Sequence, residues 1–173
     1  SFILGGRTTY SNWIFKKLEN PSFNKSRASF YDINLQISHE VNQKNSITLS
    51  GYVSSDNFKL FGDTTYAYQN QLGSIKWKHT FNPKLYGVFA GTYSRYQYSV
   101  GSERVPTSAF DLKFEINQSS AKADFTYFLH RQHTIDFGIN SVYYKLFPGT
   151  LQPTNEKSLL ISDVLEAEQA VES

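Results

Sequence analysis

The sequence contains no cysteine and no methionine, and only 10 of its 173 residues are glycine. Without cysteine there can be no disulfide, no thiolate nucleophile and no thiolate metal site. No run approaches the roughly 18 to 20 apolar residues of a transmembrane helix, so this chain could cross a membrane only with strands. The formal net charge is +2 and no arginine-rich cluster concentrates it. We therefore expect no nucleic-acid partner.

Motifs for catalysis and cofactor binding are missing as well. The chain has no glycine-rich phosphate loop, no Gly-x-Ser-x-Gly elbow and no nucleophile beside a base. His130 and His133 flank a short polar turn, and no carboxylate recurs beside them at ligand spacing, so a solvated turn is favoured over a metal pair. We expect neither an enzyme nor a cofactor. Because no initiator methionine and no signal peptide is present, we expect a processed chain or a fragment of a longer one.

What the sequence has in excess is aromatic residues, which reach 16% with 12 Tyr and 14 Phe and favour strands. Apolar and polar residues alternate strictly from Phe30 to Val41, and again after the polar turn at 42–45. A period of two indicates strands with one wet face, and the short turn predicts a hairpin. Two further hairpins are predicted around the turns at 82–84 and 130–133.

Seven strands are predicted in all, over 1–17, 29–41, 46–60, 71–81, 85–100, 109–129 and 134–146. The alternation changes phase near Gln118 to Ser120, which predicts a bulge in the sixth strand. Longer polar connections are expected at the other end of the strands, at Glu19 to Ala28, Gly62 to Asn70, Gly101 to Ser108 and after Pro148. Short turns at one end and long loops at the other are typical of outer-membrane barrels.

The fold prediction is therefore all-β: an antiparallel, up-and-down transmembrane β-barrel segment of about seven long strands, part of a larger barrel. Residues 1–150 hold the strands and loops, and residues 151–173 form an extracellular loop. Within that loop, Leu159, Leu160, Val164, Leu165 and Val171 are compatible either with a short amphipathic helix or with an irregular segment. Seven strands should not close by themselves, because single-chain bacterial barrels normally have an even number.

The alternation also assigns individual residues to the two faces of the predicted strands. The apolar side is expected to meet membrane lipid, and its members are Tyr31, Ile33, Leu35, Ile37, Ile47, Leu49, Val53, Ile75, Trp77, Phe81, Phe125, Tyr127, Leu129, Ile135, Phe137 and Ile139. The polar side is expected to face the barrel lumen, and its members are Asp32, Asn34, Gln36, Glu40, Lys76, Lys78, Lys122, Asp124, Asp136 and Asn140. Asp111 and Glu115 are placed on the lumen side too, where cross-strand pairing with lysines is the simplest role for the carboxylates.

Several segments together resemble the barrel of TonB-dependent outer-membrane receptors of the Bacteroidetes type, in the SusC-like, carboxypeptidase-regulatory-like group. The similarity covers nearly the whole chain in order and spacing, and is carried by the segments 1–10, 46–52, 77–86, 93–98, 122–129 and 133–138. It implies a 22-stranded barrel, plugged by an N-terminal domain, that imports a ligand with energy from an inner-membrane TonB complex. The chain contains no plug and no TonB box, and no ligand-binding residue carries over.

The partners that the resemblance implies are outer-membrane lipids, the remaining strands and plug of the parent chain, TonB, and a SusD-like surface lipoprotein. Two other interpretations stay open. One is a receptor-like barrel that scaffolds a surface or assembly complex without transport. The other is a soluble carbohydrate-binding β-sandwich that uses tyrosine and tryptophan as stacking platforms, which would have to hide its apolar face against a second sheet.

Overall fold

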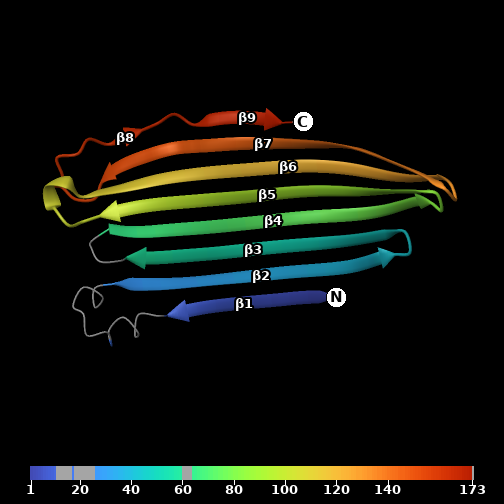
Figure 1. The fold of residues 1–173 in the computed structure, drawn as a ribbon, viewed down its shortest axis with the longest axis horizontal. Helices are drawn as coiled ribbons and strands as arrows, with labels where there is room; N and C mark the ends of the chain where they lie inside the picture. Colours follow the sequence, from blue (N-terminus) through green and yellow to red (C-terminus); the bar gives the residue numbers. More distant parts are fainter. Residues whose placement is uncertain (11–16, 18–25, 60–63, 173) are drawn as a thin grey trace.

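Seven long antiparallel strands follow one another in chain order (Figure 1). The structure is a computed structural model, and it describes residues 1–10, 17, 26–59 and 64–172. Each strand pairs with its neighbours in sequence, so the sheet is an up-and-down meander. The strands are β1 Phe2–Tyr10, β2 Arg27–Asn42, β3 Asn45–Lys59, β4 Thr64–Asn82, β5 Leu85–Ser102, β6 Phe110–His130 and β7 His133–Pro153. The antiparallel all-β prediction is confirmed.

Three short elements complete the described fold. A 3-10 helix, η1 Pro106–Ser108, lies between β5 and β6. Two short strands, β8 Asp163–Val164 and β9 Glu168–Glu172, both pair with β7. The interpretation of this segment as a short amphipathic helix is wrong, because its backbone groups bond to the edge of β7. In the part of the chain that the structure describes, no helix is long and apolar enough to cross a membrane.

Tight turns join the strands at one end of the sheet, as predicted. In the first two turns an asparagine side chain fixes the backbone: the Lys44 amide donates to Asn42 Oδ1 at 2.9 Å, and the Lys84 amide donates to Asn82 Oδ1 at 2.9 Å. Such side-chain bonds are the reason asparagine favours turns. The third turn, between His130 and His133, closes β6 onto β7. We call the half of the sheet next to these turns the turn half, and the other the loop half.

Several strands reach further into the loop half than the sequence predicts. β4 begins at Thr64, so most of the predicted loop Gly62 to Asn70 is strand, and β7 continues past Pro148 to Pro153. Part of the predicted first strand, residues 11–16, and part of the predicted loop Glu19 to Ala28 lie outside the described residues. The extra length was missed because the aromatic residues of 64–70 alternate in the phase opposite to Ile75 and Trp77.

The predicted bulge at Gln118 to Ser120 is wrong. Pairing of β6 with both β5 and β7 runs through these residues without a shift. The register changes instead nearer the loop end, between Lys113 and Glu115, where β7 contributes the additional residues Pro148 and Gly149. β6 is therefore continuous where the phase of its apolar residues changes, and its two halves are apolar on opposite faces.

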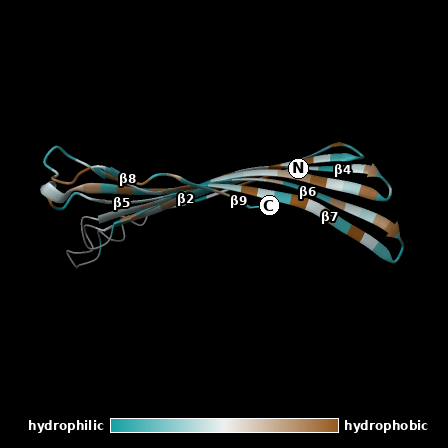
Figure 2. Cartoon of the chain, turned by 90° about the horizontal axis from the view of Figure 1, so that it is seen from above, coloured by the Kyte–Doolittle hydropathy of each residue, from teal (hydrophilic) through white to brown (hydrophobic). Residues whose placement is uncertain are grey.

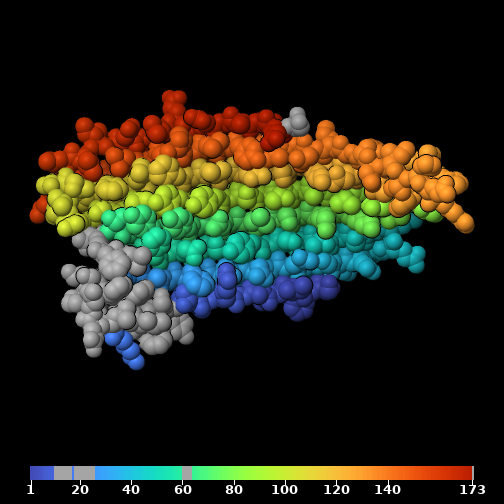
Figure 3. All heavy atoms as spheres, in the orientation of Figure 1, coloured from blue at the N-terminus to red at the C-terminus, as the bar shows by residue number. Residues whose placement is uncertain are grey.

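The described residues form one layer with almost no core. Seen edge-on, the sheet is a single ribbon of strands that twists along its length (Figure 2). Among the described residues the only buried hydrophobic side chains are Ala109 and Val142. Figure 3 shows the strands laid side by side with neither edge rolled round to meet the other. The residues that the structure describes do not form the two facing sheets that a β-sandwich requires.

Candidate membrane-facing surface

The register assigns every strand residue to one of two faces, because directly paired residues of neighbouring strands lie on the same side. Ile37 pairs with Leu49, Leu49 with Ile75, and Ile75 with Gly91, so these residues share a face. We call it the odd face, since it carries the odd-numbered side chains of β2 to β6 and of β7 up to Phe147. The opposite side is the even face. On β1 the numbering is reversed, because Phe2 pairs with Ile37.

The sixteen residues expected on the apolar side all carry odd numbers, and the fourteen that have a paired partner lie on the odd face. The other two, Phe81 and Leu129, fall at the register shifts beside the turns. Thirteen of the sixteen are exposed, among them Ile75 at 51%, Phe137 at 55% and Ile139 at 69%, whereas Ile47, Phe125 and Tyr127 are partly buried. Aromatic rings contact one another across the strands, with 5.1 Å between the centroids of Trp77 and Phe89 and 5.3 Å between those of Phe125 and Phe137. We call this surface the apolar band: the odd-face residues 31–41 of β2, 47–53 of β3, 75–81 of β4, 85–91 of β5, 121–129 of β6 and 135–139 of β7.

The apolar band slants across the strands. On β2 its limit towards the loop half is Tyr31, and on β3 it is Val53, which pairs with Ile33. On β7 the limit is Ile139. When the pairing is followed from strand to strand, Ile139 lies level with His39 of β2, which is eight residues nearer the turn than Tyr31. The band therefore drops towards the turns from β2 to β7. A bilayer crossed by inclined strands would leave a stripe of this kind.

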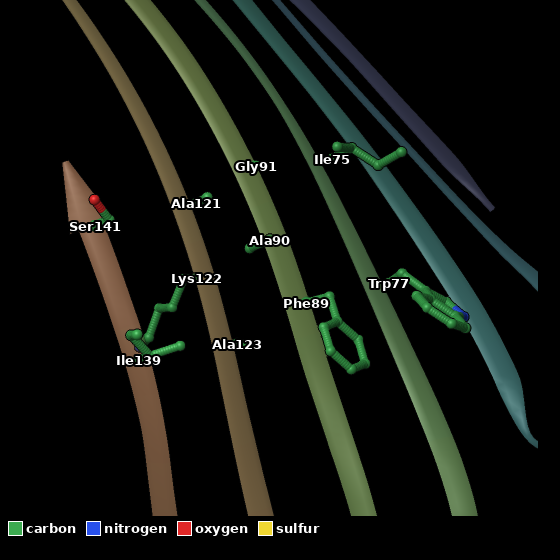
Figure 4. A pocket seen from close by; sticks show the side chains of 10 residues that line it. All are labelled: Ile75, Trp77, Phe89, Ala90, Gly91, Ala121, Lys122, Ala123, Ile139 and Ser141. Atoms are coloured by element: carbon green, nitrogen blue, oxygen red, sulfur yellow. The ribbon is translucent and has the colours of Figure 1, made fainter. Parts of the chain in front are cut away.

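A shallow groove of about 560 Å³ lies within the apolar band (Figure 4). Its floor is made of the small residues Gly91, Ala121 and Ala123 on β5 and β6. Trp77 and Phe89 stand on one side and Ile139 on the other. Apart from Ser141 and Lys122, the residues that line the groove are apolar. The groove therefore contains few groups that could form hydrogen bonds with a polar ligand.

The ten residues expected on the lumen side lie together on the even face. Some of them make polar contacts there: Lys122 Nζ is 2.9 Å from Asp124 Oδ2, and the Thr126 hydroxyl donates to Asp136 Oδ1 at 2.6 Å. Asp32 is buried and accepts a hydrogen bond from Arg7 of β1. On β2, β4 and β6 the turn half is thus apolar on the odd face and largely polar on the even face, as the alternation predicts. On β5 both faces are apolar there, and the ring of Tyr86 on the even face lies 6.1 Å from that of Phe128.

On β4 to β6, the odd face becomes polar in the loop half. Arg95 donates to Glu115 Oε2 at 2.6 Å, Gln97 donates to the same oxygen at 2.9 Å, and Asn117 donates to Glu115 Oε1 at 2.7 Å. Asp111 pairs with Lys113 on this face at 2.8 Å. The expectation that Asp111 and Glu115 share a side with the predicted lumen residues is wrong, because β6 has no bulge to bring them there.

The even face of the loop half is aromatic instead. A ladder of rings, composed of Phe58, Tyr66, Tyr68, Tyr98 and Phe114, crosses β3 to β6. Ring centroids are 4.9 Å apart for Phe58 and Tyr66, 4.8 Å for Tyr68 and Tyr98, and 5.9 Å for Tyr98 and Phe114, with the planes nearly parallel. Sequence reasoning missed this aromatic ladder because it treated residues 64–70 as a loop.

The carboxylate of Glu115 is held in its charged form by its neighbours. Partial burial alone would raise the pKa of Glu115, but hydrogen bonds from Arg95, Asn117 and Gln97 and the charge of Arg95 outweigh it and lower the pKa. The hydrogen bond between Arg95 and Glu115 also raises the pKa of Arg95. This polar network lies beyond the limit of the apolar band on β5 and β6.

Other candidate sites have no supporting arrangement in the described part of the chain. His130 and His133 pair across the third turn and are exposed. No group of three or more metal-ligating side chains forms among residues 1–10, 17, 26–59 and 64–172. In comparisons with known proteins, no family model, no curated protein and no solved structure matches the chain.

Proposed function

We propose that this chain is part of the outer-membrane β-barrel of a TonB-dependent receptor that takes up a ligand. The observation that carries the proposal is the apolar band: a slanted, exposed, one-sided stripe that ends where the odd face turns polar. Barrel strands in a membrane alternate apolar and polar residues over about 9 to 11 residues and meet lipid on one face only. The resemblance of the sequence to the barrel of these receptors supports the transport role.

The two halves of the sheet then have separate environments. In the turn half, the odd face lies in hydrocarbon and the even face in the barrel lumen, against water or a plug. In the loop half, the strands rise above the bilayer, so their odd face meets external water. The Arg95 and Glu115 network suits that position, because charged groups in hydrocarbon are costly. The aromatic ladder then points into the mouth of the barrel, towards the plug, the outer loops or the ligand.

Fractionation of cells that make the parent protein tests the membrane assignment. We expect the protein to remain with the outer membrane after washing with high salt and alkaline carbonate. Recovery in the soluble periplasmic fraction would end the proposal. A second arm separates transport from scaffolding: removal of the inner-membrane TonB complex should abolish energy-dependent uptake, whereas a barrel that only scaffolds a surface complex should keep its role.

Site-directed labelling tests which face meets lipid. Phe89→Cys places a thiol in the middle of the apolar band, and the matched control Val88→Cys places one on the even face of the same strand. In outer-membrane vesicles, we expect the thiol at 89 to react with a lipid-soluble maleimide and to resist a charged one. The thiol at 88 should show the reverse preference. Equal labelling of both positions by the charged reagent would contradict the proposed orientation.

A further inference from the structure

The groove in the apolar band continues along β6 towards the loop half. Its floor on this strand is made of Ala121 and Ala123 (Figure 4), and the next odd-face residue of the strand is Ser119. In the register, Ser119 lies between Tyr93 of β5 and Tyr143 of β7, which are 49% and 38% exposed. We call the groove together with this continuation the furrow: it is apolar near the turns and bordered by two tyrosine side chains near the loops.

Two cations flank the next row of the sheet beyond these tyrosines. Arg95, Asn117 and Lys145 are paired across β5, β6 and β7, and all three lie on the odd face. Arg95 is held by Glu115 at 2.6 Å. Lys145 forms no ion pair within the part of the chain that the structure describes, and its Nζ lies 5.1 Å from the centroid of the Phe147 ring. The loop-side end of the furrow therefore carries an uncompensated positive charge.

The carboxylates that β6 and β9 place near this row do not compete for Lys145. Glu115, one row further from the turns, is occupied by hydrogen bonds from three side chains of β5 and β6. Glu168 and Glu172 of β9 pair with even-numbered residues of β7, so they lie on the even face. An anion that approaches the odd face would therefore meet the ammonium group of Lys145.

The length of the furrow fits one leaflet of a bilayer. From Asn117 to Ala123 the strand advances by six residues, which is about 20 Å at about 3.3 Å per residue. Strands tilted by about 45° would cover about 14 Å of depth over this distance, and half of a hydrocarbon core of about 30 Å is about 15 Å. A lipid whose headgroup lies level with Lys145 would therefore place an acyl chain along Ser119, Ala121 and Ala123.

We propose that the furrow binds one anionic lipid of the surrounding membrane, with an acyl chain against the small residues of β6 and the headgroup phosphate at Lys145. The inference deepens the proposed function and rests on it, because the furrow meets lipid only if the odd face lies in hydrocarbon. Charge favours this occupant, since basic side chains at the membrane surface attract anionic headgroups. The tyrosines favour it too, because their rings settle at the level where acyl chains meet headgroups.

Fluorescence quenching by brominated lipids tests the proposal in the parent protein, because Trp77 stands on one side of the groove. The protein is placed in phosphatidylcholine vesicles that contain an increasing fraction of brominated phosphatidylglycerol, or of brominated phosphatidylcholine with the same acyl chains. The difference between wild type and Trp77→Phe gives the signal of Trp77. We expect the anionic lipid to half-quench this signal at a fraction about 5-fold lower than the zwitterionic lipid, the preference that one basic side chain at a membrane surface provides.

Three variants locate the site. Lys145→Gln should remove most of the preference for the anionic lipid, whereas Lys113→Gln should keep it, because Lys113 already pairs with Asp111 at 2.8 Å. Ala121→Leu fills the floor of the groove at an exposed position and should weaken quenching by the anionic lipid. A preference that survives both Lys145→Gln and Ala121→Leu, or that Lys113→Gln removes equally, would overturn the proposal.

The same titration separates this inference from the proposed function. Equal quenching of Trp77 by the two brominated lipids would overturn the specific site and leave the membrane assignment standing. Absence of quenching by either lipid would also overturn it. If such a protein still stays in the outer membrane after washing, another protein surface covers the furrow. If it is recovered as soluble, the proposed function fails as well.

Discussion

On β4 and β6, the turn half and the loop half share one strand and an almost unbroken register, but they are apolar on opposite faces. In the turn half, Trp77, Phe89 and Phe125 lie on the odd face. In the loop half, Tyr68, Tyr98 and Phe114 lie on the even face. A strand that passes between two surroundings can therefore reverse its pattern without any irregularity in the backbone. In the proposed barrel, this change of phase would mark where the strand leaves the bilayer.

Of the substitutions that test this difference between the faces, a lysine within the apolar band should have the largest effect on stability. We expect Phe89→Lys to destabilise the folded parent protein by about 2 to 4 kcal/mol, which is the cost of a basic side chain on the lipid-facing side of a barrel near the midplane of the bilayer. Val88→Lys, on the even face opposite Asp124, should cost less than about 1 kcal/mol. Urea unfolding in lipid vesicles measures both. Phe89→Leu controls for loss of the ring, and equal effects of the two lysines would remove the distinction between the faces.

The close packing of the β6 backbone against Gly138 of β7 can be tested within the turn half. A Cβ added there would lie 2.5 Å from the Ala123 carbonyl oxygen, whereas one added at Gly73 would meet nothing within 4 Å. We expect Gly138→Ala to destabilise by roughly 1 to 3 kcal/mol through overpacking. Gly73→Ala should be neutral or slightly stabilising, because glycine weakens strand interiors. Thermal unfolding of the two variants compares them, and a Gly138→Ala protein as stable as wild type would show that β6 and β7 lie further apart.

Removal of a ring from the aromatic ladder tests the loop half. Tyr98 stacks on Tyr68 and on Phe114, and each such pair contributes about 0.5 to 1.5 kcal/mol beyond its buried area. We therefore expect Tyr98→Ala to destabilise by roughly 1 to 3 kcal/mol, and Tyr98→Phe to retain most of the stability. Denaturant titration reports the difference. If Tyr98→Ala is as stable as wild type, the stacked rings do not contribute to stability and the aromatic ladder has no structural role.

The smallest expected effect concerns pH at the Glu115 network. Because the folded protein lowers the pKa of Glu115, its stabilising contribution is complete above the ordinary glutamate pKa and is lost as pH falls through the folded value. Wild type should therefore lose stability in that acid range, and Glu115→Gln should flatten this part of the profile. Glu103→Gln, in the exposed connection after β5, is the control. A wild-type profile that the Glu115 substitution leaves unchanged would contradict the assignment.

Local alternation was enough to predict the turn half. The three turns, the partition of residues between faces in β2 and β3, and the antiparallel order were all predicted from side-chain patterns, because hairpins depend on neighbouring residues. The loop half was harder. Tyr66 and Tyr68 were assigned to a loop since they are out of phase with Ile75, and a bulge was placed at Gln118 to explain the phase change in β6. The pairing of β9 with β7 carries no local signal.

Connectivity has a consequence for how this sheet is made. Apart from the additional pairing of β7 with β9, each long strand pairs with the strands before and after it in the chain. Each new strand can therefore pair as soon as the preceding one is in place. Contacts between neighbours in sequence close small loops and form quickly, whereas distant pairings are slow. Folding would proceed outwards from the hairpins whose turns the asparagine side chains fix. A strand that fails to pair would prevent the next one from pairing but would not unfold the strands that are already paired.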